Sequence, residues 1–522
     1  MKILNKDVRL LDFWILTLFV CGLVYRVFLI FHESFGADEV FSLNMVNLSY
    51  HTLLFKAYDA HPQLFYILSK PITDLWPNKF LLYRFVSVIF SMLGIYASYK
   101  IFRQLLSPIY LIIFIAVVAF HPILLMQSYI FRGYSLYFSM IMLSFYNLEE
   151  WFRYEKISNA IGSIFFIWCA LNSHFFSLLF FVFYGTFKLI YLMKNKKTLI
   201  SFVKNIFVPL IILLTPYWIQ LVGFLHFLSL GTESKLSSLS WIKQTIGFYF
   251  YIITGGYVRS LPDINHFYEF FDSLNKLQII VMCIHCLYAV IIGLIFLFSL
   301  LNREYLKKNI LYYWLFFGSF LILFIQHTRY FNSYSLPFLI PIFWFIILNY
   351  ISQCKGDMFR KVLLIVIFLF SLHQIIVFLY SPKLIFDKDV ATYLKQSDKK
   401  INFVYYVAHQ PLEVDYYYNQ PKNFFKYHGK DILQYYINKN GFYIFEIYKK
   451  DIIGSINNIR KLKVKSYNLY LLFPEKNFSL SPDDHHEEVT SLIIKSGYVL
   501  KEFKNIDPNH RYTIKIEKYV LP

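Results

Sequence analysis

Two adjacent carboxylates, Asp38 and Glu39, stand directly after the first long apolar run of the chain. At the edge of a membrane a negative side chain is costly unless it has a partner or a chemical task. Asp59 and His61 follow in the same polar stretch, which ends where Arg84 opens the next apolar run. The plain alternative is that the two carboxylates only begin a solvated loop.

Five further polar residues stand at the ends of later apolar runs: Arg132, Tyr134, His174, Arg329 and Tyr330. A guanidinium presents donors in a fixed fork that matches phosphate oxygens. Three arginines, with Arg84 as the first, beside a carboxylate pair therefore indicate a site that handles phosphate. The alternative for each arginine is snorkelling to a lipid phosphate. His174 is equally well explained by a hydrogen bond within a helix turn.

The composition indicates which kind of scaffold must position these residues. Of 522 residues, 57% are hydrophobic and only 16% charged, and the mean hydropathy is +0.48, which is too apolar for a soluble protein. Repeated apolar runs of about 18 to 20 residues predict a polytopic α-helical membrane protein. The net charge is +19, but lysine and arginine gather in short loops between the runs, as orientation in a membrane requires, which argues against a nucleic-acid partner.

The five cysteines lie in or beside apolar runs and predict no disulfide framework. Cys283 and Cys286 have the spacing of half a zinc site, but the second half is missing, so we expect no zinc there.

Eleven apolar runs predict eleven membrane spans, at approximately 10–31, 84–102, 108–127, 134–148, 157–172, 175–193, 204–224, 277–301, 310–326, 336–352 and 362–380. The first run is longer than the core of a signal peptide and lacks a small-residue cleavage site behind it. We therefore expect it to remain as a span.

Lysine and arginine are distributed unequally between the two sets of loops. One set holds Lys2, Lys6, Arg9, Lys100, Arg103, Arg153, Lys156, Lys194, Lys196, Lys197, Arg303, Lys307, Lys308, Lys355, Arg360 and Lys361. The short loops of the other set hold only Arg132 and Arg329. The positive-inside rule then predicts a multi-pass protein of the cell membrane with a cytoplasmic N-terminus. Eleven crossings place the C-terminus outside the cytoplasm.

Two long loops fall on the predicted outer side, at 32–83 and 225–276. Leu64–Trp76 in the first is apolar enough to lie along the membrane surface as short helices. Long ordered loops often form lids or binding segments, which is our expectation for the second loop.

Beyond residue 380 the charged residues increase and continuous apolar runs end. Alternating stretches at 401–407, 441–447 and 467–473 predict strands, separated by turn residues. We therefore expect a transmembrane domain over 1–380 and an extracytoplasmic soluble α/β domain over 381–522.

Several short motifs occur in a fixed order over approximately residues 10–350. They are Ala37-Asp38-Glu39, Asp59-Ala60-His61-Pro62-Gln63-Leu64-Phe65-Tyr66, Tyr83-Arg84-Phe85-Val86-Ser87, His121-Pro122 with Arg132-Gly133-Tyr134, Asn172-Ser173-His174-Phe175, and Arg329-Tyr330 followed by Pro337 and Pro341. In these motifs the chain resembles the GT-C class of integral membrane glycosyltransferases, in particular the bacterial lineage related to protein O-mannosyltransferases and aminoarabinose transferases. It departs from them at Gln63, where the family usually has a second proline.

The resemblance implies an enzyme that moves a sugar from a polyprenyl-phosphate carrier to an acceptor hydroxyl on the extracytoplasmic side. Asp38 then matches the family's acidic position and is the expected general base, with Glu39 as the reserve. The leaving phosphate would be stabilised by Arg84, Arg132 and Arg329. The remaining expected substrate-binding residues are Asp59, His61, Tyr134, His174 and Tyr330.

No cofactor is expected, because the arginines can supply the positive charge. A divalent metal would be the alternative if Asp38, Glu39 and Asp59 converge. A single displacement with one base predicts inversion at the anomeric carbon. The acceptor stays open between a lipid, a glycan and a protein.

Two other functions remain as alternatives. A flippase or transporter for lipid-linked sugars would place charges within its spans and often contains internal repeats. A glycan ligase would have a large outer loop late in the chain instead of an acidic pair after the first span. The sequence has no recognisable repeat, and its charges gather at one predicted face, so we favour the glycosyltransferase.

Overall fold

A computed structural model describes residues 2–32, 37–55, 62–77, 79–193, 195–214, 249–250, 252–254, 276–325 and 336–380, together with five strands near the C-terminus. The chain divides into two compact units. The helical unit comprises Met1–His32, Met45–Arg259 and Ile280–Tyr380. The sheet unit comprises Glu33–Asn44, Ser260–Ile279 and Ser381–Pro522.

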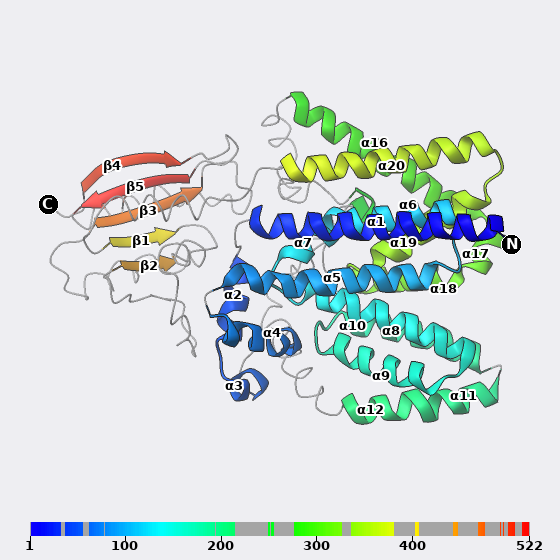
Figure 1. The fold of residues 1–522 in the computed structure, drawn as a ribbon. Helices are drawn as coiled ribbons and strands as arrows, with labels where there is room; N and C mark the ends of the chain where they lie inside the picture. The colour runs from blue at the N-terminus through cyan, green and yellow to red at the C-terminus, as the bar shows by residue number, and fades with distance from the viewer. Residues whose placement is uncertain are drawn as a thin grey trace. The chain divides into compact units, whose positions relative to one another are not determined.

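The helical unit is built from long apolar helices joined by short turns (Figure 1). Its helices in chain order are α1 (Lys2–His32), α3 (Tyr50–Phe55), α4 (Leu64–Leu75), α5 (Phe80–Phe102), α6 (Pro108–Phe120), α7 (Pro122–Tyr129), α8 (Tyr134–Tyr154), α9 (Ile157–Leu171), α10 (Ser177–Leu192), α11 (Lys196–Phe202), the π-helical turn η1 (Val203–Phe207), α12 (Val208–Leu214), α16 (Lys276–Leu301), α17 (Arg303–Lys308), α18 (Ile310–Ile325), α19 (Leu339–Gln353) and α20 (Asp357–Tyr380). The short helix α2 (Ala37–Val46) begins in the sheet unit and ends in the helical unit, and the first turn of α16, up to Ile279, also belongs to the sheet unit.

Each of the eleven predicted spans contains a described helix. Length and composition alone qualify five stretches as membrane spans: Leu10–Phe31, Leu81–Phe102, Lys196–Leu214, Ile279–Leu301 and Asp357–Ile376. The bent pair α6 and α7 raises this number to six. The protein is therefore a multi-pass helical membrane protein, and the count of eleven stays a prediction.

One predicted span is not a single straight helix in the structure. The run at 108–127 was expected as a single helix, but it is broken into α6 and α7, which are bent by 48°. His121 between them has an extended backbone, and Pro122 lacks the N–H that would continue the ladder of hydrogen bonds. The His-Pro dipeptide is the physical cause of the break.

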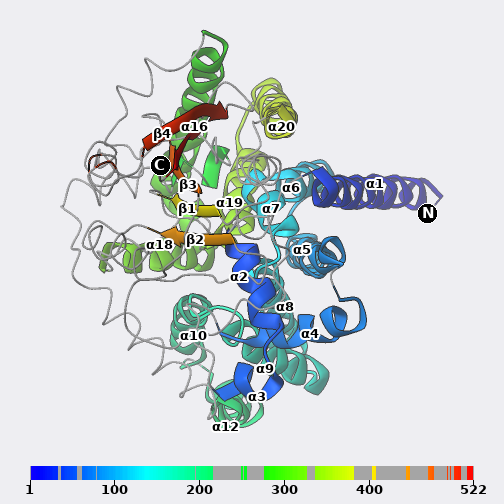
Figure 2. The same ribbon diagram turned by 90° about the vertical axis from the view of Figure 1, so that its left-hand side faces the viewer.

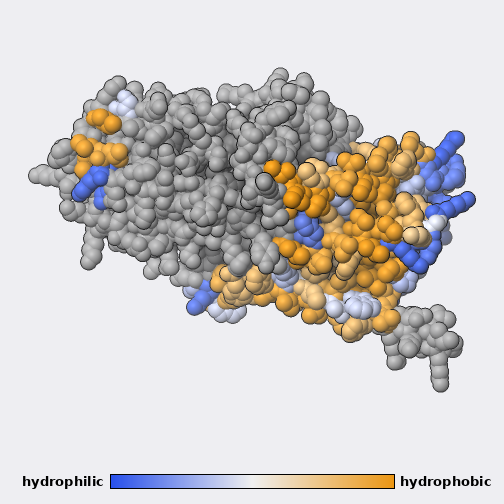
Figure 3. All heavy atoms as spheres, turned by 90° about the horizontal axis from the view of Figure 1, so that it is seen from above, coloured by the Kyte–Doolittle hydropathy of each residue, from blue (hydrophilic) through white to orange (hydrophobic). Residues whose placement is uncertain are grey.

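The described surface of the helical unit that faces the viewer in Figure 3 is mostly apolar. Large hydrophobic side chains on α1, α16 and α20 are exposed, including Leu16, Leu287 and Phe368. Hydrophilic residues gather at the right-hand end of the view, the end at which Figure 1 has α17. An apolar band with a polar border is the surface that a lipid bilayer requires.

The core of the helical unit lies along α5 and α8, which pack side by side (Figures 1 and 2). The next helix, α9, packs against α8. A Cβ atom added at Gly94 of α5 would lie only 2.5 Å from the ring of Phe138 on α8. The close approach of these two helices therefore depends on the missing side chain at Gly94.

The sheet unit contains a mixed five-stranded sheet with the order β2-β1-β3-β5-β4. Its strands are β1 (Asn402–Tyr406), β2 (Phe442–Glu446), β3 (Asn468–Pro474), β4 (Val499–Ile506) and β5 (Ile514–Val520). β1 pairs in parallel with β2 and β3, whereas β5 pairs in antiparallel with β3 and β4. The three predicted strands are confirmed, and the last two are additional. The helical part of the predicted α/β domain falls on residues outside the described ones, so it stays a prediction.

Candidate functional site

Several motif residues come together at one end of the helical unit, where α1 and α9 end and α5, α8 and α10 begin. We call this the motif end. The following contacts within the helical unit join its parts.

Arg84 lies in the first turns of α5 and is completely buried. Its Nη1 donates a hydrogen bond of 3.0 Å to the carbonyl of Ile30, near the end of α1. Its guanidinium lies 5.7 Å from the ring centroid of Tyr129, the last residue of α7. A snorkelling arginine would be exposed at the lipid surface, so the burial of Arg84 argues against that interpretation.

Arg132 lies in the turn between α7 and α8 and is 6% exposed. Its Nη1 donates a hydrogen bond of 2.8 Å to the hydroxyl of Tyr66 on α4. The turn itself is fixed by Ser87 of α5, whose hydroxyl donates to the Ile130 carbonyl over 2.8 Å. Arg132 is therefore a second buried cation, held by α4 directly and by α5 through the turn that carries it.

Tyr134 and His174 are neighbours, with ring centroids 5.9 Å apart. The ring of His174 also stacks on Tyr137 at 4.6 Å. Its Nδ1 accepts a hydrogen bond of 3.2 Å from the backbone N–H of Phe176, so a neutral His174 carries its proton on Nε2. His174 thus has the hydrogen bond within a helix turn that the sequence analysis gave as the alternative to a functional role. It also contacts Tyr134 of the Arg132-Gly133-Tyr134 motif.

The helix α4 is tied to the same end by its first turn. The N–H of Leu64 donates to the Asn172 carbonyl over 3.2 Å. A Cβ atom added at Gly133 would lie 3.4 Å from both the Phe65 side chain and the Ser173 carbonyl. Four of the sequence motifs, those containing Tyr66, Arg84, Arg132 and His174, therefore meet within the helical unit.

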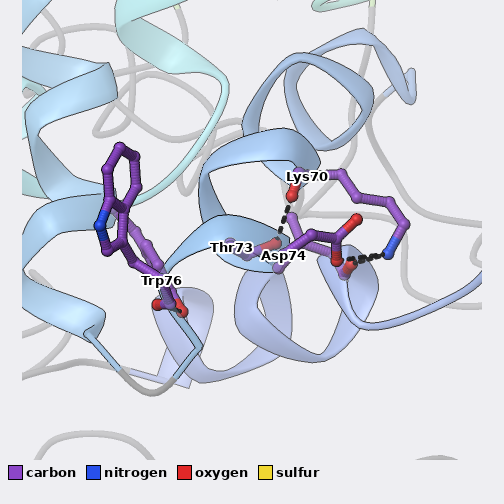
Figure 4. Close-up of polar contacts among 6 residues, drawn as sticks. Lys70, Thr73, Asp74 and Trp76 are labelled. Carbon is purple, nitrogen blue, oxygen red and sulfur yellow. Dashed lines mark hydrogen bonds and ion pairs between the residues drawn. The ribbon is translucent and has the colours of Figure 1, made fainter.

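Lys70 on α4 is a buried cation that the sequence analysis did not select. It is 8% exposed, and its Nζ lies 3.1 Å from the Val46 carbonyl and 3.1 Å from an Asp74 carboxylate oxygen. Figure 4 shows Lys70 turned toward Asp74, with the Thr73 hydroxyl bonded to the Lys70 carbonyl. Val46 is the last residue of α2, so the Lys70 ammonium caps the C-terminal end of that helix.

Asp38 and Glu39 lie in the first turn of α2 and belong to the sheet unit, whereas the described arginines belong to the helical unit. Glu39 is 1% exposed, and the side chain of Asp38 lies outside the described part of the structure. Among the described residues no group of three or more His, Cys, Asp or Glu has the geometry of a metal site. Asp59, His61, Arg329 and Tyr330 also lie outside the described residues.

A second buried cation that the sequence analysis did not select is Arg26. Arg26 lies within the apolar run of α1 and is 0% exposed. The signal that could have identified it is the charge itself, because an ionisable residue inside a span is rare without a role.

No protein-family model and no curated protein matches the chain. Among solved structures, the apo crystal structure of ArnT from Cupriavidus metallidurans matches over 98% of both chains, with a TM-score of 0.50 and 9% identity. The structure of the same protein bound to undecaprenyl phosphate also covers 98% of both chains, with a TM-score of 0.49 and 10% identity. The chain has the ArnT fold. The resemblance to aminoarabinose transferases that the motifs predicted is therefore confirmed at the level of the fold.

Proposed function

We propose that this ArnT-like protein is a membrane glycosyltransferase that moves a sugar from a polyprenyl-phosphate carrier to an acceptor hydroxyl. The observation that carries the proposal is the pair of buried arginines at the motif end, Arg84 and Arg132, within a fold shared with ArnT. Burial of a guanidinium is costly, and a site that must hold a phosphate is one reason to maintain it.

The two arginines support a role in binding the donor phosphate. Each uses Nη1 for a protein acceptor, Ile30 in one case and Tyr66 in the other. These bonds fix the orientation of the guanidinium, and a fixed donor can stabilise the charge that develops on a leaving phosphate without reorganising during the reaction. In this proposal Arg329 adds a third cation, and Tyr134, His174, Asp59, His61 and Tyr330 complete the substrate site.

Asp38 is the proposed general base, which accepts the proton of the acceptor hydroxyl as it attacks the anomeric carbon. Glu39 is the reserve, and its burial on α2 is that of a carboxylate with a specific environment rather than a solvated loop residue. One base and a single displacement give inversion at the anomeric carbon. The arginines supply the positive charge in this scheme, and a divalent metal remains the alternative for the three carboxylates.

The proposed organisation follows the sequence. In this proposal the lysines and arginines of one set of loops put the N-terminus in the cytoplasm. Eleven spans over 1–380 then put the domain over 381–522 on the extracytoplasmic side. The acceptor would then be a lipid, a glycan or a protein of the cell envelope.

The test is transfer of a radiolabelled sugar from a defined polyprenyl-phosphate donor in vesicles that contain the purified protein, with lipid, glycan and peptide acceptors in parallel. Asp38→Asn retains the size of the side chain and removes the base, so transfer should fall by about two orders of magnitude or more while donor binding persists. Movement of the intact labelled donor between leaflets, without formation of a new glycosidic bond, would instead identify a flippase. Near-normal transfer by Asp38→Asn would direct attention to Glu39.

A further inference from the structure

Arg26 is a completely buried cation inside α1, one of the stretches that qualifies as a membrane span. Its Nε donates to the Ser91 hydroxyl of α5 over 3.1 Å. Its Nη1 donates to the Gly22 carbonyl over 3.1 Å and to the Ala119 carbonyl over 2.8 Å. One side chain therefore joins α1 to both α5 and α6, the helices beside it in Figure 1.

The carbonyl of Ala119 needs a partner because α6 ends at Phe120. The last carbonyls of an α-helix have no partner within the helix, and in an apolar environment an unsatisfied carbonyl is costly. His121 is extended and Pro122 has no N–H, so the chain cannot continue the ladder. Arg26 supplies the missing donor from a different helix.

The positive charge of Arg26 is offset by the C-terminal end of α6. No carboxylate in the described part of the chain forms an ion pair with Arg26, but the C-terminal end of a helix carries a partial negative charge. The guanidinium lies against that end of α6. On the other side of the break the Nε2 of His121 donates to the Ile252 carbonyl over 3.0 Å, so the bend is held from two directions.

The break determines where the next helix leads. α7 is only eight residues long, and it ends at Tyr129, whose ring lies against Arg84. Its Leu125 and Tyr129 pack in a cluster with Leu29 and Ile30 of α1. The turn that follows carries Arg132. A change in the angle between α6 and α7 would therefore displace the partner of one motif arginine and the backbone of the other.

We propose that Arg26 is a positioning residue that fixes the bend between α6 and α7 and thereby places Tyr129 and Arg132 for binding of the donor phosphate. The role of Arg26 in donor binding rests on the proposed function, whereas its role in fixing the bend does not. Arg26 itself touches only protein groups, so it acts through α7.

Two measurements test the role of Arg26 in fixing the bend separately from its role in donor binding. The first is amide hydrogen exchange of the purified protein without any donor, followed in the segment 122–132 and compared with the segment 157–171 of α9. The second is the steady-state transfer assay, with KM for the polyprenyl-phosphate sugar and kcat measured separately. The variants are Arg26→Met, Arg26→Lys and Ser91→Ala, and the matched control is Arg103→Met at the exposed C-terminal cap of α5.

Arg26→Met should accelerate exchange in 122–132 by about tenfold or more, since it removes charged hydrogen bonds, and leave α9 unchanged. Arg26→Lys keeps the cation but not the fork, so an intermediate effect is expected. Ser91→Ala should have the smallest effect, because it leaves the bond to Ala119. In the assay KM for the donor should rise by about tenfold with a smaller change in kcat. Arg103→Met should resemble the parent in both readouts.

Exchange that stays at the parental rate in 122–132 in both Arg26→Lys and Arg26→Met would overturn the positioning role. Uniformly faster exchange in both segments would also overturn it, since Arg26 would then be a general core residue. If Arg26→Met does not fold, Arg26→Lys and Ser91→Ala carry the same comparison. Should the parent protein lack transferase activity, the proposed function fails while the exchange data still decide the structural part.

Discussion

At the scale of single residues, the buried cations have different partners and therefore different expected tolerances. Arg84 contacts a backbone carbonyl and an aromatic ring, Arg132 contacts a tyrosine hydroxyl, and Lys70 contacts a carbonyl at a helix end. A planar guanidinium can be replaced by an ammonium only where a single point charge suffices. Substitution by the other cation thus distinguishes the roles of these residues.

Arg84→Lys should weaken binding of the polyprenyl-phosphate donor by about tenfold or more, equivalent to roughly 1.4 kcal/mol. The lysine keeps the charge but cannot both bond Ile30 and present a second fixed donor to phosphate. Arg132→Lys should behave similarly. Titration of a short-chain donor into the purified protein measures the affinity, with Arg103→Lys as the control at an exposed position. Parental affinity in both motif variants would remove the arginines from the donor site.

Lys70→Met should lower the free energy of unfolding by about 1–2 kcal/mol, because the carbonyl at the end of α2 loses a charged donor. Lys70→Arg retains a cation at that place and should cost less. Asp74→Asn is the matched control: the Asp74 side chain is 54% exposed, so its ion pair with Lys70 should contribute under about 1 kcal/mol. Thermal denaturation in detergent followed by intrinsic fluorescence compares the variants. Equal effects of Lys70→Met and Asp74→Asn would mean that the ion pair, not the cap, is the stabilising contact.

At the scale of elements, the close packing of α5 and α8 depends on Gly94. Gly94→Ala should destabilise the protein by about 1–3 kcal/mol through overpacking against Phe138, even though alanine favours a helix by about 1 kcal/mol. Gly185→Ala on α10 is the control, since an added Cβ there meets nothing within 4 Å. Differential scanning fluorimetry should show a lower melting temperature for Gly94→Ala and an equal or higher one for Gly185→Ala. The reverse order would contradict the close approach of these two helices.

The elements also show what could be predicted from the sequence. Long apolar runs located the helices, and alternating residues located β1, β2 and β3, because both patterns depend on local periodicity. β4 and β5 were missed: the adjacent charges Lys501 and Glu502 interrupt the alternation on β4, and Lys518 stands at an apolar position of the alternation on β5. The bend after α6 was missed because the hydropathy of an apolar run does not indicate whether the helix that it forms is straight or bent.

The candidate site was predictable to a different extent. The sequence selected Arg84, Arg132, Tyr134 and His174 as charged or polar residues at helix ends, and the structure brings their segments together at the motif end. It did not select Arg26 or Lys70. The roles of those two depend on unpaired carbonyls of other segments, Ala119 and Val46, which are distant in sequence. The spacing of residues along the sequence does not indicate which distant backbone carbonyl a buried cation will contact.

At the scale of the whole molecule, the orientation in the membrane is a prediction from loop charges, and two positions on opposite sides can test it. Cys354 follows α19 beside Lys355, in a loop predicted to be cytoplasmic. Trp76 follows α4, is 51% exposed and is predicted to lie outside. A protein with Cys354 as its only cysteine should react with a membrane-impermeant maleimide only after permeabilisation. A protein with Trp76→Cys as its only cysteine should react in intact cells.

The reaction of Cys354 should also depend on pH in a characteristic way. Partial burial raises the pKa of the Cys354 thiol, and the charge of Arg360 offsets that shift only in part. The thiolate is the reactive form, so at neutral pH less of Cys354 is reactive than of a free cysteine, and the labelling rate should continue to rise at pH values where free cysteine has levelled off. The same pH series on permeabilised cells therefore separates a slow thiol from an inaccessible one. Labelling of both cysteines from the same side would show that the predicted number of crossings between them is wrong. Labelling of Cys354 in intact cells with protection of Trp76→Cys would show that the predicted orientation is reversed.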